Sequence, residues 1–190
     1  KIIGQPMFDH AAAHGFPPDF FTSSYFDHVD FGHIPEGADC SCSQFRNCTF
    51  RGSIVKCVFD DAAIYDSDFE QADLRMVNFT GASIAHTRFR GSSLTFVSFL
   101  DARLKGGYMR DCSFDIVDFK GAAIDGTWIG RAQASHVLNL LHASITQGGT
   151  TQEDVERLRI SIFRALRVYP HPVKLRPPAP RRKKGRAPER

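Results

Sequence analysis

The stretch that decides the fold reads Cys57-Val58-Phe59-Asp60-Asp61-Ala62-Ala63-Ile64, and its pattern returns every 20 residues. The later copies are Val77-Asn78-Phe79-Thr80-Gly81-Ala82-Ser83-Ile84, Val97-Ser98-Phe99-Leu100-Asp101-Ala102-Arg103-Leu104 and Val117-Asp118-Phe119-Lys120-Gly121-Ala122-Ala123-Ile124. A repeat of this length is typical of a solenoid, in which each repeat buries its apolar face against its neighbours. The sequence therefore predicts a stacked architecture, although such a repeat says little about what the stack binds.

A shorter period of five residues runs inside this repeat. Large apolar residues occupy every fifth position from Ile54 to Ile129, and a small or β-branched residue lies two positions before each of them. This spacing fits neither a helix, with a period of about 3.6, nor a flat strand, with a period of about 2. It fits a chain that turns a corner every five residues and sends one large and one small side chain inward on each of four sides. Cys40, Phe45 and Phe50 lie one residue out of phase with Ile54, so we expect the corner near Arg51 to lack a residue.

Several five-residue units resemble the consensus of the pentapeptide-repeat family, which is a small residue, Asp or Asn, Leu or Phe, and two variable residues. Ala72-Asp73-Leu74, Ser67-Asp68-Phe69 and Val77-Asn78-Phe79 are examples. The resemblance covers residues 38–130 and implies an all-β solenoid, a right-handed, four-sided (quadrilateral) β-helix. Residues 1–37 are expected to form an N-terminal segment, in which Phe21, Phe26 and Phe31 are compatible with an irregular first coil.

Stacking the coils predicts interior columns of equivalent residues. The coils should lie about 4.8 Å apart, the ordinary distance between strands, so that aromatic rings stack on one another. Each buried Phe should contribute roughly 1.5–3 kcal/mol to stability. The predicted structural core is a phenylalanine column and an alanine column, made of Phe59, Phe79, Phe99, Phe119, Ala62, Ala82, Ala102 and Ala122.

Beyond residue 130 the apolar pattern changes to a helical spacing. Within Ala134–Ile145, apolar residues recur at helical intervals, and Thr150 with Glu153 makes a capping box before a second apolar stripe that Pro170 ends. Residues 131–169 are therefore expected to form an α-helical cap on the last coil, or a face for a homodimer or a partner. The residues expected in this cap or dimer contact are Trp128, Leu138, Leu141, Leu158, Ile162 and Phe163.

Charge is distributed unevenly along the chain. Residues 1–130 hold 11 Lys or Arg and 17 Asp or Glu, a net charge of −6, whereas residues 131–190 hold 13 and 4, a net charge of +9. Residues 170–190 form a Pro-rich basic tail that is too poor in apolar residues to fold alone. Such a tail either stays solvated or binds nucleic acid or an acidic partner. Its expected contact residues are Lys174, Arg176, Arg181, Arg182, Lys183, Lys184 and Arg186.

Catalytic motifs are scarce in this sequence. His10 and His14 have the spacing of two metal ligands on a helix, but the Glu of a zincin motif is lacking. Neither a glycine-rich phosphate loop nor a nucleophile elbow occurs, so we expect no enzyme, no cofactor and no metal site. No apolar run is long enough to span a membrane. Five cysteines, an odd number, favour the cytoplasm or another reducing compartment. Because the chain starts at Lys1, a targeting segment ahead of it stays an open alternative.

Two classes of function remain. The first is a non-catalytic scaffold, a protein-interaction module that docks on a larger assembly and uses the basic tail. The second is implied by the family resemblance: some pentapeptide-repeat proteins bind type II topoisomerases such as gyrase, imitate duplex DNA, and protect against quinolones. The modest net charge of −6 over residues 1–130 and basic residues such as Arg88 and Arg90 argue against a DNA mimic. The scaffold is therefore the preferred hypothesis.

Overall fold

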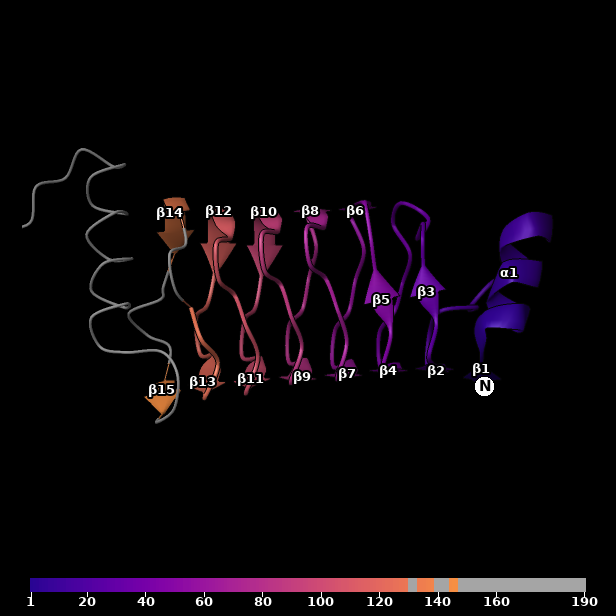
Figure 1. The fold of residues 1–190 in the computed structure, drawn as a ribbon, viewed down its shortest axis with the longest axis horizontal. Helices are drawn as coiled ribbons and strands as arrows, with labels where there is room; N and C mark the ends of the chain where they lie inside the picture. The colour runs from indigo at the N-terminus through magenta and orange to yellow at the C-terminus, as the bar shows by residue number, and fades with distance from the viewer. Residues whose placement is uncertain (130–132, 139–143, 147–190) are drawn as a thin grey trace, which may run out of the picture.

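The computed structural model describes residues 1–129, 133–138 and 144–146. In these residues short parallel strands stack along one long axis, from β1 beside helix α1 at one end to β14 and β15 at the other (Figure 1). The described residues thus form an all-β parallel solenoid with one helix at its N-terminal end. Its elements are β1 (Ile2–Ile3), α1 (Gln5–His14), β2 (Tyr25–Asp27), β3 (Asp30–Phe31), β4 (Gln44–Arg46), β5 (Thr49–Phe50), β6 (Ser53–Val55), β7 (Ala63–Tyr65), β8 (Asp73–Arg75), β9 (Ser83–Ala85), β10 (Ser93–Ser98), β11 (Arg103–Lys105), β12 (Ser113–Asp118), β13 (Ala123–Asp125), β14 (Gln133–Leu138) and β15 (Ser144–Thr146).

Parallel pairing follows four sides of each coil. One side is an eight-stranded sheet in the order β1-β2-β4-β7-β9-β11-β13-β15, and a second is a five-stranded sheet in the order β14-β12-β10-β8-β6. A third side starts with the pair β3 and β5 and continues as single bridges from Thr49 to Trp128. The fourth consists of bridges that run from Asp39 through Val58 and Asn78 to Ser98. Four sides of five residues account for the length of the repeat.

Each corner is made by a residue in the left-handed region of the backbone. From Lys56 to Gly126 every fifth residue has a positive φ, which explains the period of five. Glycine, Asp and Asn tolerate this conformation best. Ile116, with a φ of +54°, is a β-branched residue for which the conformation is unfavourable. The corner residues in this interval are Lys56, Asp61, Asp66, Gln71, Met76, Gly81, His86, Gly91, Phe96, Asp101, Gly106, Asp111, Ile116, Gly121 and Gly126.

The interior consists of columns in which equivalent side chains of successive coils touch. The ring centroids of Phe59 and Phe79 lie 5.0 Å apart, and those of Phe79 and Phe99, and of Phe99 and Phe119, lie 5.1 Å apart. All four rings are fully buried, as are the alanines Ala62, Ala82, Ala102 and Ala122. At about 1.5–3 kcal/mol for each buried ring, this column is a major source of stability.

The corner near Arg51 is a residue shorter than the corners that follow it along the chain. Along the third side, Thr49 bridges Asp68, and Asp68 bridges Arg88. The chain from Thr49 to Asp68 is one residue shorter than the chain from Asp68 to Arg88. The eight-stranded sheet shows the same difference, since the step from Phe45 to Ile64 is one residue shorter than the step from Ile64 to Ile84. The predicted loss of one residue at this corner is confirmed.

The N-terminal segment closes its end of the stack with a helix that the sequence did not lead us to expect. In α1 the Phe8 ring packs edge-on against the ring of Phe31, with 4.9 Å between centroids. The side-chain amide of Gln5 meets the backbone of Asp30: the Asp30 N–H donates to Gln5 Oε1 over 2.6 Å, and Gln5 Nε2 donates to the Asp30 carbonyl over 3.4 Å. This side chain takes the place of a further strand at Asp30, so the N–H and carbonyl of that residue are paired at the open edge. Strands β2 and β3, with Phe26 and Phe31, form the irregular first coil.

At the other end, the helix expected over Ala134–Ile145 is wrong wherever the structure describes that segment. Strand β14 pairs with β12, and β15 pairs with β13. The step along the chain from Ala123 to its partner Ser144 is one residue longer than the step from Arg103 to its partner Ala123. Leu138 keeps the regular step from its partner Asp118, so the extra residue comes after Leu138 and shifts Ile145 out of the five-residue phase. Leu138, expected in the cap, is the last residue of β14, whereas Leu141, Leu158, Ile162 and Phe163 lie outside the described residues.

Candidate interaction surface

The outward side chains on one side of the stack form the surface with the most varied chemistry. We call it the arginine face. It consists of the residues immediately before and after the buried column of Phe31, Phe50, Phe69, Phe89, Met109 and Ile129, together with the adjoining corners. The bridges Asp68 to Arg88, Arg88 to Tyr108 and Tyr108 to Trp128 place these residues in successive rows.

Charge is segregated along the arginine face. Toward the N-terminal end, Asp68 and Glu70 occupy one row, and toward the C-terminal end Arg88 and Arg90 occupy the next. Arg88 Nε lies 3.7 Å from the Asp68 carboxylate, a distance that in an exposed pair contributes little to stability. The Glu70 carboxylate and the Arg90 guanidinium have no opposite charge within 4.0 Å among the described residues. The face therefore has an acidic half and a basic half that meet between these two rows.

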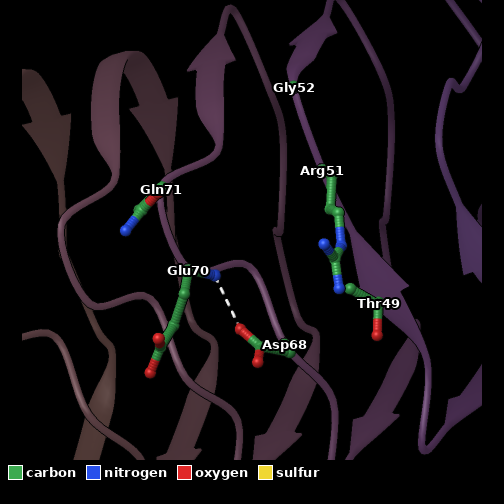
Figure 2. Close-up of a pocket in the computed structure, with 6 residues that line it drawn as sticks. All are labelled: Thr49, Arg51, Gly52, Asp68, Glu70 and Gln71. Atoms are coloured by element: carbon green, nitrogen blue, oxygen red, sulfur yellow. Dashed lines mark hydrogen bonds between the residues drawn. The ribbon is translucent and has the colours of Figure 1, made fainter.

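A hollow of about 330 Å³ opens in the acidic half. Figure 2 shows Arg51 on one wall and Asp68 and Glu70 on the other, where the Glu70 N–H donates to Asp68 Oδ1 over 2.7 Å. The hollow lies beside the shortened corner, and a side chain at Gly52 would meet nothing within 4 Å. The missing residue thus leaves a space on an otherwise regular surface. The lining residues are Thr49, Arg51, Gly52, Asp68, Glu70 and Gln71.

Two aromatic side chains stand out from the basic half. Tyr108 is 48% exposed and Trp128 is 36% exposed, with 6.4 Å between their ring centroids. The guanidinium carbon of Arg110 lies 5.2 Å from the centre of the Trp128 ring, a cation–π contact. Trp, Tyr and Arg are the residue types most enriched at the energetic centres of protein interfaces. Trp128 was expected to contact the C-terminal cap, and the structure places it on the arginine face.

The side that carries the phenylalanine column is acidic on its outside. Asp39, Asp60, Asp61, Asp101 and Asp118 flank this column or occupy its corner, and Lys120 opposes them. Asp60 Oδ1 is buried without a hydrogen-bond partner in the described chain. Burial, and then the charge of Asp61, raise the pKa of Asp60. Hydrogen bonds from Ser41 lower the pKa of Asp39.

An apolar stripe lies along the corner after the five-stranded sheet. Met76 and Phe96 are 52% and 54% exposed, and half-buried Ile116 follows them at the same corner. These residues combine an unfavourable left-handed backbone with exposed apolar surface. Nothing in the described residues covers them.

His10 and His14, singled out in the sequence for their spacing, both lie on helix α1. The rings of His10 and His14 stack on helix α1 with 4.3 Å between centroids, and His14 Nδ1 lies 2.8 Å from the His10 carbonyl oxygen. Among the described residues no group of three or more His, Cys, Asp or Glu side chains could hold a metal ion. Likewise, none of the helices in this part of the chain has the length and apolar character needed to cross a bilayer. The basic tail from Lys174 to Arg186 lies outside the described residues.

Four of the five cysteines are packing residues in the interior of the solenoid. Cys40, Cys48, Cys57 and Cys112 are free and buried, and Cys42 is free and exposed. Burial raises the pKa of Cys48 to about 11 and that of Cys112 to about 12. These thiols are therefore protonated at neutral pH, and protonated thiols are poor nucleophiles.

Comparison with known proteins agrees with the register of the coils. A family model of pentapeptide repeats matches residues 57–95 and 72–111, in 8 copies. A pentapeptide repeat protein (Rfr23) from the cyanobacterium Cyanothece 51142 is 11% identical, with a TM-score of 0.37, over 57% of this chain and 62% of its own. Full-length QnrB1, a plasmid-mediated fluoroquinolone resistance protein, is 18% identical, with a TM-score of 0.35, over 74% of this chain and 90% of its own. A pentapeptide repeat protein of the Arabidopsis thaliana thylakoid lumen is 17% identical, with a TM-score of 0.32, over 76% of this chain and 98% of its own. No curated protein matches the chain. The family match and the four-sided register together show that the solenoid of this chain is built from pentapeptide repeats.

Proposed function

We propose that this chain is a non-catalytic scaffold, a protein-interaction module that docks on a larger assembly through the outer sides of its solenoid. The observation that carries the proposal is the arginine face, where Tyr108, Trp128 and four arginines project from a backbone held by parallel pairing. A rigid backbone lowers the entropy lost on binding, and these residue types supply the strongest contacts at protein interfaces.

In this proposal residues 170–190 form a second contact, to nucleic acid or to an acidic partner. The tail holds eight Lys or Arg and one Glu, and phosphate backbones attract such a polycation. Residues 147–169, with the stripe of Leu158, Ile162 and Phe163, form the cap or a contact with a partner. The solenoid, with its net charge of −6 over residues 1–130, would not bind phosphates without the tail.

Removal of residues 174–190 tests the role of the tail. The intact chain should bind fluorescent single-stranded or duplex DNA in anisotropy titrations, and the shortened chain should not. If about six phosphates are neutralised, log K should fall with log salt at a slope near −5. A tail of the same composition in scrambled order is the matched control, because a purely electrostatic contact should survive scrambling. Absence of binding by the intact chain at low salt would make the tail a solvated appendage.

A second candidate function is DNA mimicry at a type II topoisomerase. Its support is the acidic side around Asp60, Asp61 and Asp101, which runs along the stack, together with the match to pentapeptide repeats. The arginine face and the low net charge favour the scaffold over this candidate.

A further inference from the structure

We propose that the arginine face pairs with the arginine face of a second copy of this chain, with the two solenoids antiparallel. The observation that suggests it is the order of charges along the face. Asp68 and Glu70 share one row, and Arg88 and Arg90 share the next, so one face is the electrostatic complement of its own reversed copy.

The geometry of a two-fold axis makes this complement specific. A two-fold axis perpendicular to the contact plane would leave the two copies side by side. The proposed dimer instead has a two-fold axis that lies in the contact plane, between these two rows and perpendicular to the long axis of the solenoid. This second axis stacks the two copies face to face. The second axis reverses the order of rows and keeps the left and right columns in place. Asp68 and Arg88 belong to the column before the buried residues, and Glu70 and Arg90 to the column after them. Arg88 of one copy therefore faces Asp68 of the other, Arg90 faces Glu70, and the symmetry makes each contact twice.

The opposite orientation of the two copies is unfavourable. A two-fold axis parallel to the solenoid would bring identical rows together, so that arginines would face arginines and carboxylates would face carboxylates. Like charges across an interface cost several kcal/mol. The charge order thus selects the antiparallel arrangement.

The rows on either side of the centre agree with the same arrangement in shape. The row of Tyr108 comes to lie opposite the row of Thr49, and Thr49 lines the hollow at the shortened corner. The projecting Tyr108 ring therefore has a recess to enter. One pair opposes the contact, since Arg110 lies opposite Arg51. Asp111 lies 3.4 Å from Arg110, and Asp30 lies 3.8 Å from Arg51, and these carboxylates offset the repulsion.

The size of the face predicts a weak association. Six rows about 4.8 Å apart, on a side about 10 Å wide, bury on the order of 300 Å² per copy. Stable complexes bury about 800 Å² per partner. We therefore expect a reversible dimer with a micromolar or higher Kd that salt weakens.

Sedimentation velocity of the full chain, at about 50 mM and about 500 mM salt, tests the proposal. Arg90→Glu and Glu70→Arg should each weaken self-association at low salt by about tenfold or more, since each places like charges at two symmetric contacts. An equimolar mixture of the two variants should recover association, because the mixed dimer restores opposite charges at one of these contacts and reverses both signs at the other. The parallel arrangement, in which Arg90 would face Arg88 and Glu70 would face Asp68, does not predict that recovery.

Matched controls carry the same changes of charge on another side. Arg103→Glu and Asp125→Arg, both exposed on the eight-stranded sheet, should leave the association unchanged. A loss of the protruding ring in Tyr108→Ala should also weaken the dimer, whereas Tyr65→Ala on that other side should not. The last pair keeps the test valid if a charge reversal fails to fold. A monomeric wild-type chain at low salt, self-association that ignores both reversals, or a mixture that stays monomeric would each overturn the proposal.

Discussion

Gly107 shows how closely successive coils approach one another. A Cβ at this position would lie 2.5 Å from the carbonyl oxygen of Thr87 in the coil before it, and the backbone of Gly107 is not left-handed. Gly32 has an equally ordinary φ, but a Cβ there would meet nothing within 4 Å. Replacing each glycine with alanine therefore distinguishes two effects. At Gly107 the new side chain would clash with the neighbouring coil, whereas at Gly32 it would only reduce the conformational freedom of the unfolded chain.

We expect Gly107→Ala to lower the free energy of unfolding by roughly 1–3 kcal/mol, because the backbone of a neighbouring coil must move. Gly32→Ala should be neutral or stabilise by about 0.4–1 kcal/mol, since alanine reduces the freedom of the unfolded chain. Urea unfolding followed by circular dichroism measures both. Equal effects of the two substitutions would show that the coils do not approach closely at Gly107.

Asp60 and Asp39 should affect stability in opposite directions with pH. Burial raises the pKa of Asp60 above its usual value of 3.8, so ionisation of this carboxyl destabilises the fold once the pH exceeds that value. Asp60→Asn should therefore raise the Tm at pH 7, and the gain should disappear as the pH falls below 3.8. Hydrogen bonds from Ser41 lower the pKa of Asp39, so its ionised form stabilises the fold above the usual value of 3.8, and this contribution is lost as the pH falls through the lowered pKa.

Asp39→Asn should accordingly lower the Tm at pH 7 and have no effect in strong acid. Thermal unfolding of both variants and the wild-type chain across this pH range measures the two effects. The same sign for both variants at pH 7 would contradict the assigned environments.

Helix α1 replaces the missing neighbour of the first coil. Phe8 covers the ring of Phe31, and Gln5 pairs with the backbone of Asp30 at the open edge. Phe8→Ala should lower the free energy of unfolding by about 3–5 kcal/mol, because it uncovers the end of the aromatic column. Met7, in the same helix, is 53% exposed, and Met7→Ala should change stability little.

Hydrogen exchange locates the effect of the missing Phe8 ring. In the Phe8→Ala variant the amides of β2 and β3 should lose protection before those of β9 and β11, since each coil contacts only its neighbours. Uniform loss of protection along the whole stack would contradict this description of α1 as a local cap.

The elements that could be predicted from the sequence are those whose cause repeats. Each left-handed corner and each inward pair of residues recurs at every fifth position, so the sides of the coil and the shortened corner near Arg51 follow from spacing alone. The ends do not repeat. Only Phe8 and Ala11 of α1 are buried, too few for an apolar stripe, and one extra residue before β15 shifts Ile145 out of the five-residue phase. The arginine face was missed because its members lie a full coil apart along the chain and become neighbours only when the coils stack.

At the scale of the whole molecule, the two halves of the chain have opposite charge. Residues 1–130 carry −6 and residues 131–190 carry +9, so a partner of uniform charge that is attracted by one half is repelled by the other. A DNA mimic has to compete with duplex DNA for a topoisomerase, which requires acidic walls and gains nothing from a basic tail. A scaffold that uses the tail requires the reverse.

Gyrase supercoiling, with and without a quinolone, therefore separates the two candidate functions. We expect neither inhibition nor protection by the intact chain at micromolar concentration, because the tethered positive segment opposes the field of the acidic side. The chain without residues 174–190 is the informative comparison at matched ionic strength, since a mimic should keep or gain activity when the tail is lost. Activity that is retained without the tail and weakened by neutralising Asp60, Asp61, Asp66 and Asp68 would establish DNA mimicry in place of the scaffold. If the tail-less chain is also inactive, its walls are too weakly acidic to displace DNA, as the four basic residues Arg88, Arg90, Arg103 and Arg110 on its sides predict.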